Sequence, residues 1–233
     1  MGQQKGLFVT GTDTGVGKTF VTCLLASHLK DYMKVGVMKP AESDCEEVEG
    51  QWLPKDALRL KVAAGSHMPL DTICPYALPR PLAPAEAARE AGITIDLEHI
   101  KEKYRNIAEA SDVVLVEGAG GLLVPLSHSC LYADLVRDLK LPLLIVARAG
   151  LGTVNHSLLT VESALSRGIR VIGVLLNENE SCEHDASYWS NPRVLQDLAS
   201  VPVLGPLPHM ECDPGAKNAV QEVLREIERL AFS

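Results

Sequence analysis

The glycine-rich segment that follows the first apolar run constrains this chain more than any other stretch. Residues 6–19 read GLFVTGTDTGVGKT, an apolar run that enters a glycine-rich turn and then helix-forming sequence. Successive backbone N–H groups in such a turn converge on an anion, and the following helix adds its positive N-terminal end. Lys18 can reach terminal phosphates, and the Thr19 hydroxyl can ligate Mg²⁺. The segment therefore predicts a phosphate-binding loop.

This loop departs from the usual phosphate-loop spacing G-x-x-x-x-G-K-[ST]. Thr12 stands where that pattern requires glycine, and Gly11 lies one residue too early. The physical requirements still hold, because an expected strand precedes the loop and residues 20–26 continue as a buried helix. An ordinary glycine turn is the simpler alternative, which the placement of Gly-Lys-Thr at a helix start disfavours.

Net charge and the lengths of the apolar runs limit which partners this chain can bind. A formal charge of −8 opposes nucleic-acid binding, so an anionic ligand must be small and held by a local cluster such as that around Lys18. No apolar run approaches the roughly 20 residues of a membrane span, and the N-terminus lacks a basic segment followed by a long apolar one. The six cysteines form no C-x-x-C pair and are expected to be reduced. We expect a cytoplasmic protein that binds neither nucleic acid nor membrane.

Strands and helices are expected to alternate along the chain. Helices are predicted over residues 18–29, 56–64, 97–110, 131–139, 154–167 and 216–232, and strands over residues 35–40, 113–116, 143–147, 170–177 and 201–205. The acidic residues 41–54 read as an exposed loop, and five prolines in residues 69–84 exclude a regular helix or central strand and suggest a loop that walls a pocket. This pattern predicts an α/β fold, a single doubly wound domain over residues 1–233 whose mostly parallel central sheet is flanked by helices.

Polar residues stand where predicted strands end, which is the edge where open α/β sheets bind ligands. Lys39 ends the strand over residues 35–40, Glu117 directly follows residues 113–116, and Asn177 ends residues 170–177. Glu117 suits Mg²⁺, with turn chemistry as the alternative, and Lys39 would otherwise be a surface lysine. Asp56 falls in the first turn of a predicted helix. The helix dipole favours a carboxylate there even when that carboxylate has no functional role.

With these residues in hand, the chain resembles the dethiobiotin synthetase family over most of its length. The resemblance rests on residues 11–19 (GTDTGVGKT), Val37-Met38-Lys39-Pro40 with Ser43 following, Asp56-Ala57, residues 117–121 (EGAGG), residues 124–126 (VPL) and residues 155–160 (NHSLLT). One departure is Gly15, where better-known members often carry glutamate. The resemblance implies a P-loop NTPase fold and an ATP-dependent cyclo-ligase of biotin biosynthesis, with Mg²⁺ as cofactor and ATP as co-substrate.

The family chemistry joins CO₂ to 7,8-diaminopelargonic acid as a carbamate, transfers the ATP γ-phosphoryl group to it and closes the ureido ring, releasing ADP and phosphate. By resemblance, Thr14, Lys18 and Lys39 are catalytic. Nucleotide contacts are implied for Gly15, Val16, Gly17, Lys18, Thr19, Phe20, Glu117, Gly118, Gly120 and Asn177, the last at the adenine. Metal ligands are Thr19, Asp56 and Glu117, and substrate contacts are Lys39, Ser43, Gly121 and Asn155.

The resemblance also implies a homodimer in which Asn155 binds the diamine acid of the neighbouring subunit. From the residues themselves, Gly150 and Gly152 give the preceding segment backbone freedom, and Asn155 is expected to begin or cap a helix whose free N–H groups suit a carboxylate. A helix cap with no substrate contact is the alternative interpretation for Asn155.

Two other classes share this type of loop. A partitioning-type switch ATPase carries a second lysine five residues before the phosphate-loop lysine, where this chain has Asp13. A cobyrinic-acid-type amide synthetase domain needs a glutaminase partner with a cysteine nucleophile, for which this chain has no room. Both are less favoured than the cyclo-ligase.

Overall fold

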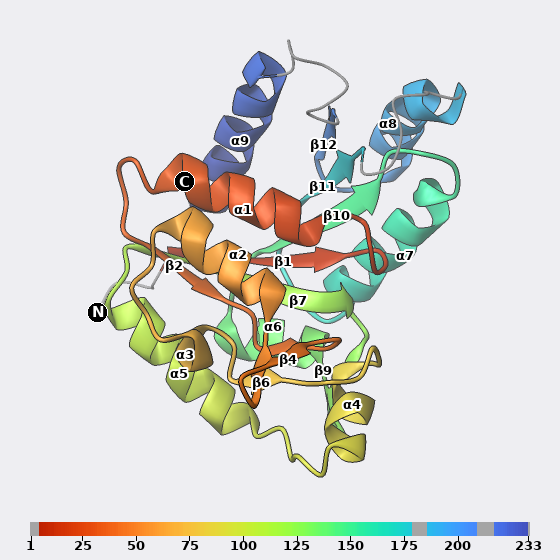
Figure 1. Cartoon of the computed structure of the whole chain (residues 1–233). Helices are drawn as coiled ribbons and strands as arrows, with labels where there is room; N and C mark the ends of the chain where they lie inside the picture. The colour runs from red at the N-terminus through yellow and green to blue at the C-terminus, as the bar shows by residue number, and fades with distance from the viewer. Residues whose placement is uncertain (1–4, 179–185, 209–216, 233) are drawn as a thin grey trace.

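Six parallel strands form the central sheet of the computed structural model, which describes residues 5–178, 186–208 and 217–232 (Figure 1). The sheet has the order β12-β11-β10-β1-β7-β2, and all its registered pairings are parallel. Its strands are β1 (Lys5–Gly11), β2 (Val35–Met38), β7 (Val113–Gly121), β10 (Leu143–Arg148), β11 (Val171–Asn177) and β12 (Val203–Leu207). The mostly parallel sheet predicted from the sequence is confirmed.

Helices cover both faces of this sheet. On one face lie α1 (Lys18–Leu29), α2 (Lys55–Ala64) and α9 (Lys217–Phe232), and on the other lie α5 (Leu97–Glu109), α6 (Tyr132–Leu139), α7 (Thr153–Leu165) and α8 (Ala186–Leu198). Neighbouring residues of β1 serve opposite faces: Leu7 and Val9 belong to the cluster of α1, α2 and α9, whereas Phe8 belongs to the other. Strands buried on both faces explain why these segments are continuously apolar instead of alternating.

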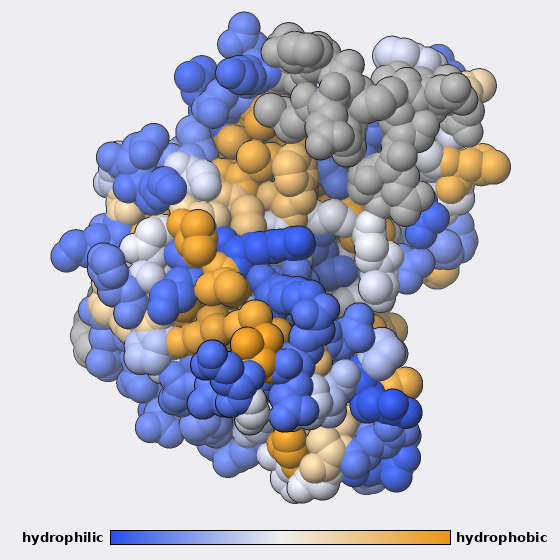
Figure 2. All heavy atoms as spheres, in the orientation of Figure 1, coloured by the Kyte–Doolittle hydropathy of each residue, from blue (hydrophilic) through white to orange (hydrophobic). Residues whose placement is uncertain are grey.

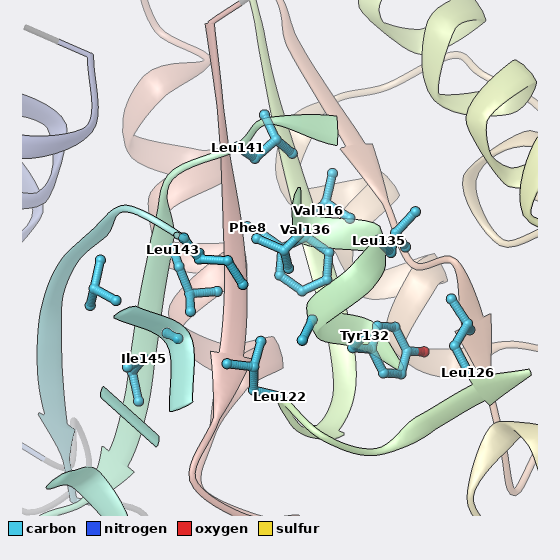
Figure 3. Close-up of a cluster of buried hydrophobic side chains, with 14 of the residues drawn as sticks. Phe8, Val116, Leu122, Leu126, Tyr132, Leu135, Val136, Leu141, Leu143 and Ile145 are labelled. Atoms are coloured by element: carbon cyan, nitrogen blue, oxygen red, sulfur yellow. The ribbon is translucent and has the colours of Figure 1, made fainter. Parts of the chain in front are cut away.

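The cluster around Phe8 also fixes the chain beside the later site. Figure 3 shows Phe8, Val116 and Tyr132 gathered between the sheet and α6. The rings of Phe8 and Tyr132 lie 6.2 Å apart, and both side chains are fully buried. Full burial of such a side chain contributes about 1.5–3 kcal/mol. The Tyr132 hydroxyl donates to the Ala41 carbonyl at 3.5 Å, which ties the segment after β2 to this core.

The prediction of an exposed loop over residues 41–54 is wrong. The short strand β3 (Ala41–Glu42) is buried and pairs in parallel with β6 (Tyr76–Ala77), while β4 (Glu46–Val48) and β5 (Gln51–Leu53) form an antiparallel hairpin. Glu49 and Gly50 turn the hairpin with positive φ angles of 54° and 78°, as a two-residue type I′ turn requires. The acidic composition reflects the exposed hairpin and conceals the buried strand before it.

Short elements also occupy the proline-rich segment and its surroundings. The single turn α3 (Leu70–Ile73) begins directly after Pro69, α4 (Pro84–Glu90) has Pro84 in its first turn, and β6 lies outside the central sheet. Proline is tolerated in a first helical turn because the N–H it lacks would have no partner there. Neither α4, α8 nor the hairpin of β8 (Pro125–Ser127) and β9 (Cys130–Leu131) was predicted.

Most other predicted boundaries differ from the structure by one or two residues, as helix and strand ends commonly do. Ala216, the predicted start of the last helix, lies outside the described residues, as do Cys182 and Cys212.

The helices of the described chain include none that is long and apolar enough to span a membrane. Figure 2 shows hydrophobic atoms over α2, whose Leu58 and Val62 are exposed while Ala57 and Leu60 pack inward.

Candidate functional site

The glycine-rich loop connects β1 to α1 along a path that only glycine allows at one position. Gly17 has a φ of 92°, and the Asn177 Nδ2 atom lies 2.1 Å from where a Cβ at residue 17 would stand. The Lys18 Nζ atom reaches back over the loop and donates to the Asp13 carbonyl at 3.0 Å. Among the residues that the structure describes, no side chain caps the N-terminus of α1, and the positive end of this helix suits an anion.

A cavity of about 650 Å³ opens at the N-terminus of α1, beside the carboxyl ends of β1 and β2. It is lined by Thr14, Gly15, Gly17, Lys18, Thr19, Phe20, Lys39, Glu42, Ser43, Asp44, Asp56, Arg59, Pro81, Leu82, Ala83, Pro84, Ala119, Gly120 and Val124. The proline-rich segment thus does wall a pocket, as predicted. Most of the predicted site residues meet here, although they come from four separate stretches of the chain.

Glu117 does not line this cavity, but its carboxylate contacts two predicted residues that do, Thr19 and Lys39. Its side chain is fully buried, and its Oε1 atom accepts from the Thr19 hydroxyl at 2.8 Å and from Lys39 Nζ at 2.5 Å. Glu117 lies inside β7 and does not end the strand as predicted, because β7 continues to Gly121, which pairs with Gly11 of β1.

Lys39 is buried among oxygen atoms directly after β2. Its Nζ atom also donates to the Gly118 carbonyl at 3.2 Å and lies 3.8 Å from the Asp56 Oδ2 atom. Burial acts to lower the pKa of Lys39, but the carboxylates of Glu117 and Asp56 outweigh it and raise that pKa. The lysine therefore carries a positive charge at neutral pH. Because Lys39 is only 3% exposed, the alternative of a surface lysine is excluded.

The oxygen atoms around Glu117 suit a hard cation such as Mg²⁺. Within the described residues, Glu117 Oε2 is buried and has no hydrogen-bond partner. With the Thr19 hydroxyl and the partly exposed Asp56 carboxylate, it makes a set of hard oxygen donors. No three residues of the His, Cys, Asp and Glu types cluster for a metal in the described chain. A metal held here would therefore need phosphate or water oxygens as its remaining ligands.

Lys18 carries a positive charge that titrates near physiological pH. Burial, followed by repulsion from Lys39, lowers the pKa of Lys18 to about 8. A bound polyphosphate favours the charged form of Lys18 and so raises the pKa of this lysine. Binding near or above pH 8 is therefore accompanied by uptake of a proton by Lys18. As the pH rises above about 8, nucleotide affinity is therefore expected to fall.

We therefore expect proton uptake on ADP binding at pH 8.5. Calorimetric heats measured without metal in two buffers of different ionisation enthalpy would differ, and Lys18→Ala would remove the difference. Equal heats in both buffers for the unaltered protein would contradict the lowered pKa.

Asn177, at the end of β11, contacts the phosphate loop at Val16. Asn177 is 1% exposed, and its Nδ2 atom donates to the Val16 carbonyl at 3.0 Å. Its Oδ1 atom is buried without a hydrogen-bond partner in the part of the chain that the structure describes. This amide oxygen can accept from an amino group such as that of adenine.

Gly121 and Asn155 are two predicted site residues that do not line the first cavity. Gly121 lines another cavity, of about 470 Å³, together with Thr14, Gly120 and His156. Asn155 is exposed on α7 and lines neither cavity. The prediction that Asn155 begins or caps the helix is wrong, because Gly152 is the N-cap and Asn155 is the third helical residue. The φ of 88° at Gly152 lets the helix start earlier than the sequence suggested.

Arg59 and Glu42 are among the lining residues that were not predicted as site residues. Arg59 lies one helical turn after Asp56, with its guanidinium 3.6 Å from the Asp56 carboxylate. The i,i+3 spacing of the two charges could have indicated this pair. Glu42 accepts hydrogen bonds from the backbone N–H groups of Asp56 and Ala57, fourteen and fifteen residues away. No local pattern identifies such a contact.

Comparisons with known proteins agree with this geometry. A family model described as an AAA domain matches residues 5–212. The ATP-dependent dethiobiotin synthetase BioD of Thermodesulfovibrio yellowstonii is 42% identical over 213 residues, spanning 88% of this chain and 89% of that protein. The protein of the same description from Anaeromyxobacter dehalogenans strain 2CP-C is 53% identical over 175 residues, spanning 74% and 76%.

A more distant likeness concerns the fold. The cell division ATPase MinD of Pyrococcus furiosus superposes with a TM-score of 0.56 and 17% identity, covering 98% of this chain and all of that one. At this identity the likeness extends to the arrangement of strands and helices alone.

Proposed function

The chain belongs to the ATP-dependent dethiobiotin synthetase family and is an ATP-dependent cyclo-ligase of biotin biosynthesis, and from this premise we propose that it acts on 7,8-diaminopelargonic acid, CO₂ and ATP. One observation carries the proposal: the buried, charged Lys39 shares a single cavity with Lys18 of the phosphate loop. A site that brings an anionic carbamate against an anionic triphosphate needs a cation for each.

The proposed reaction has three steps. One amine of the substrate attacks CO₂ and loses a proton, which gives a carbamate. A carbamate oxygen then attacks the γ-phosphorus of ATP, ADP leaves, and a carbamic–phosphoric anhydride forms. Finally the second amine attacks the carbonyl carbon, phosphate leaves with the bridging oxygen, and the loss of a proton completes the cyclic urea.

Each step assigns a task to side chains of the cavity. Lys18 and the loop residues Gly15, Val16, Gly17, Thr19 and Phe20 would hold the phosphates, with Gly118 and Gly120 beside them. Lys39 would neutralise the carbamate and the transferred phosphoryl group. Thr14 lines both cavities and is proposed to orient the carbamate between them. Ser43 and Gly121 would contact the substrate, and Asn177 the adenine.

Thr19, Asp56 and Glu117 are proposed to hold Mg²⁺. Bound there, Mg²⁺ would neutralise negative charge on the ATP phosphates. The orphaned Glu117 Oε2 atom and the two further oxygen donors support this set.

Asp56→Asn and Glu117→Gln are each expected to raise the Mg²⁺ concentration for half-maximal activity by about tenfold or more, since each removes a negative ligand from a hard cation. Titration of activity with Mg²⁺ at saturating ATP measures the change. An unchanged midpoint in both variants would return Asp56 to helix-dipole stabilisation and Glu117 to a structural partner of Lys39.

A homodimer is proposed to complete the substrate site, with Asn155 of one subunit contacting the diamine acid held by the other. Asn155 is exposed and lines neither of the two cavities of its own chain, which supports this arrangement. The free N–H groups in the first turn of α7 would then face the substrate carboxylate.

Mixing two inactive variants tests the shared site. After verified subunit exchange, Lys18→Ala chains and Asn155→Ala chains are expected to recover up to about a quarter of the unmixed activity, because half of the dimers carry one intact site. A mixture that gives only the sum of the two residual rates would contradict a shared site.

We propose the cytoplasm as the compartment. ATP is available there, and Cys23, Cys45, Cys74 and Cys130 are free thiols, as expected in a reducing environment.

Isotope transfer tests the proposed steps. With ¹³C- and ¹⁸O-labelled CO₂, the ureido carbon of the product should carry ¹³C and the released phosphate should carry one ¹⁸O, because the carbamate oxygen leaves on phosphorus. Unlabelled phosphate alongside a labelled product would contradict phosphoryl transfer to the carbamate.

A further inference from the structure

The first turn of α2 receives its hydrogen-bond acceptor from a distant strand. Pro54 is the N-cap of α2 and offers no side-chain acceptor, so the first N–H groups of the helix need another partner. Glu42 of β3 supplies it: Oε1 accepts from the Asp56 N–H at 2.8 Å, and Oε2 accepts from the Ala57 N–H at 2.9 Å. A carboxylate that accepts two such bonds at a helix N-terminus makes charge-assisted contacts of fixed direction.

Glu42 is itself held firmly. Glu42 is only 7% exposed, and its backbone carbonyl accepts from the Leu78 N–H at 2.8 Å. The residue before it, Ala41, accepts from the buried Tyr132 hydroxyl at 3.5 Å. Glu42 therefore connects α2 to the core cluster around Phe8 and Tyr132. Glu42 also lines the cavity.

This connection determines where the Asp56 carboxylate lies. The bond to Glu42 begins at the backbone nitrogen of Asp56 itself, and the next residue, Ala57, is fully buried. The side chain that projects from this fixed backbone places Oδ2 3.8 Å from Lys39 Nζ, next to the pair of Lys39 and Glu117. A shift or rotation of the first turn of α2 would move Asp56 away from these groups.

We propose that Glu42 is a positioning residue that holds the first turn of α2, so that Asp56 is aimed at the metal. The inference rests on the proposed function in one respect, that Asp56 is a metal ligand. Glu42 acts through Asp56 because both its carboxylate oxygens are engaged by backbone N–H groups of α2. The loss of such an outer partner typically weakens metal binding by 10- to 100-fold.

A double-mutant cycle tests this dependence. The readout is equilibrium binding of Mn²⁺ to the protein–ADP complex, followed by electron paramagnetic resonance, which requires no turnover. The variants are Glu42→Gln, Asp56→Asn and the double variant, with Glu47→Gln on the exposed β4 strand as the matched control. Glu42→Gln keeps the volume of the side chain but replaces one acceptor oxygen by an NH₂ group, which cannot accept from a backbone N–H.

We expect Glu42→Gln to weaken Mn²⁺ binding about tenfold, Glu47→Gln to leave it unchanged, and Glu42→Gln to have less than a twofold effect in the Asp56→Asn background. ADP affinity in EDTA should stay within about twofold of the unaltered protein, as it reports the fold and the phosphate loop without metal. If the glutamine variant fails to bind ADP, Glu42→Asp, which keeps the charge on a shorter side chain, takes its place in the same cycle.

Three outcomes would overturn the inference. An equal loss of Mn²⁺ affinity from Glu42→Gln in both backgrounds would mean that Glu42 acts independently of Asp56. Unchanged Mn²⁺ binding in Glu42→Gln, with a loss in Asp56→Asn, would leave the proposed metal site intact and remove Glu42 from it. Unchanged binding in Asp56→Asn would overturn the proposed metal ligand itself, and the role of Glu42 with it.

Discussion

Lys18→Ala is expected to abolish nucleotide-dependent turnover, with a loss in kcat/KM of about 100-fold or more. One positive group aimed at a developing phosphoryl charge is typically worth about 3 kcal/mol. Lys18 meets the conditions for such a contribution, because it is 7% exposed and its Nζ atom is held over the phosphate loop by the Asp13 carbonyl at 3.0 Å. A charge in this water-poor position interacts with phosphate more strongly than a surface lysine does.

The measurement is ADP release in the presence of both substrates, beside the same assay for Lys30→Ala. Lys30 is an exposed lysine at the C-terminal end of α1, so its loss changes the net charge equally without touching the loop. Turnover of Lys18→Ala within tenfold of the unaltered protein, or an equal loss in both variants, would contradict the assigned role.

Lys39→Met is expected to separate nucleotide binding from ring closure. ATP affinity should change by no more than about threefold, while product formation falls about 100-fold or more, because Lys39 would face the carbamate and the transferred phosphoryl group. Its present partners are Glu117 at 2.5 Å and the Gly118 carbonyl at 3.2 Å, both outside the glycine-rich loop. Calorimetry with ATP and a product assay by mass spectrometry measure the two effects.

This variant has a structural cost that needs its own control. Removing one member of a buried ion pair leaves the carboxylate of Glu117 uncompensated, and such losses typically destabilise by about 3–5 kcal/mol. The thermal midpoint is therefore expected to fall, and binding is to be measured well below it. A loss of ATP affinity that matches the loss of rate in the folded variant would make Lys39 a triphosphate contact only.

Sequence periodicity predicted the parts of this fold that local forces determine. The buried strands are continuous apolar runs, and the boundaries of α1 follow from the glycine-rich turn before it, so both were predictable. The hairpin of β4 and β5 and the burial of Glu42 were not predicted. A carboxylate inside an acidic stretch is buried here because it accepts from the distant N–H groups of α2. The extended course of β7 past Glu117 likewise depends on pairing with Gly11.

The candidate site was predictable in its residue types but not in its pairings. Lys39 and Glu117 were both assigned to the ligand-binding edge of the sheet, yet nothing in the sequence says that they contact each other. The helix start was predicted within one residue, but the cap was assigned to Asn155, whereas Gly152, with its positive φ, is the N-cap of α7. Asn155 lies within the helix and lines neither of the two cavities described above.

The central claim is that ATP hydrolysis in this protein is coupled to ring closure. The most direct measurement is ADP release with the diamine acid plus bicarbonate, compared with release in the presence of glutamine, DNA or neither. The account predicts that only the diamine acid plus bicarbonate stimulates ADP release, with one dethiobiotin formed for each ADP. Stimulation by DNA or glutamine, or ADP release without a matching amount of dethiobiotin, would contradict it.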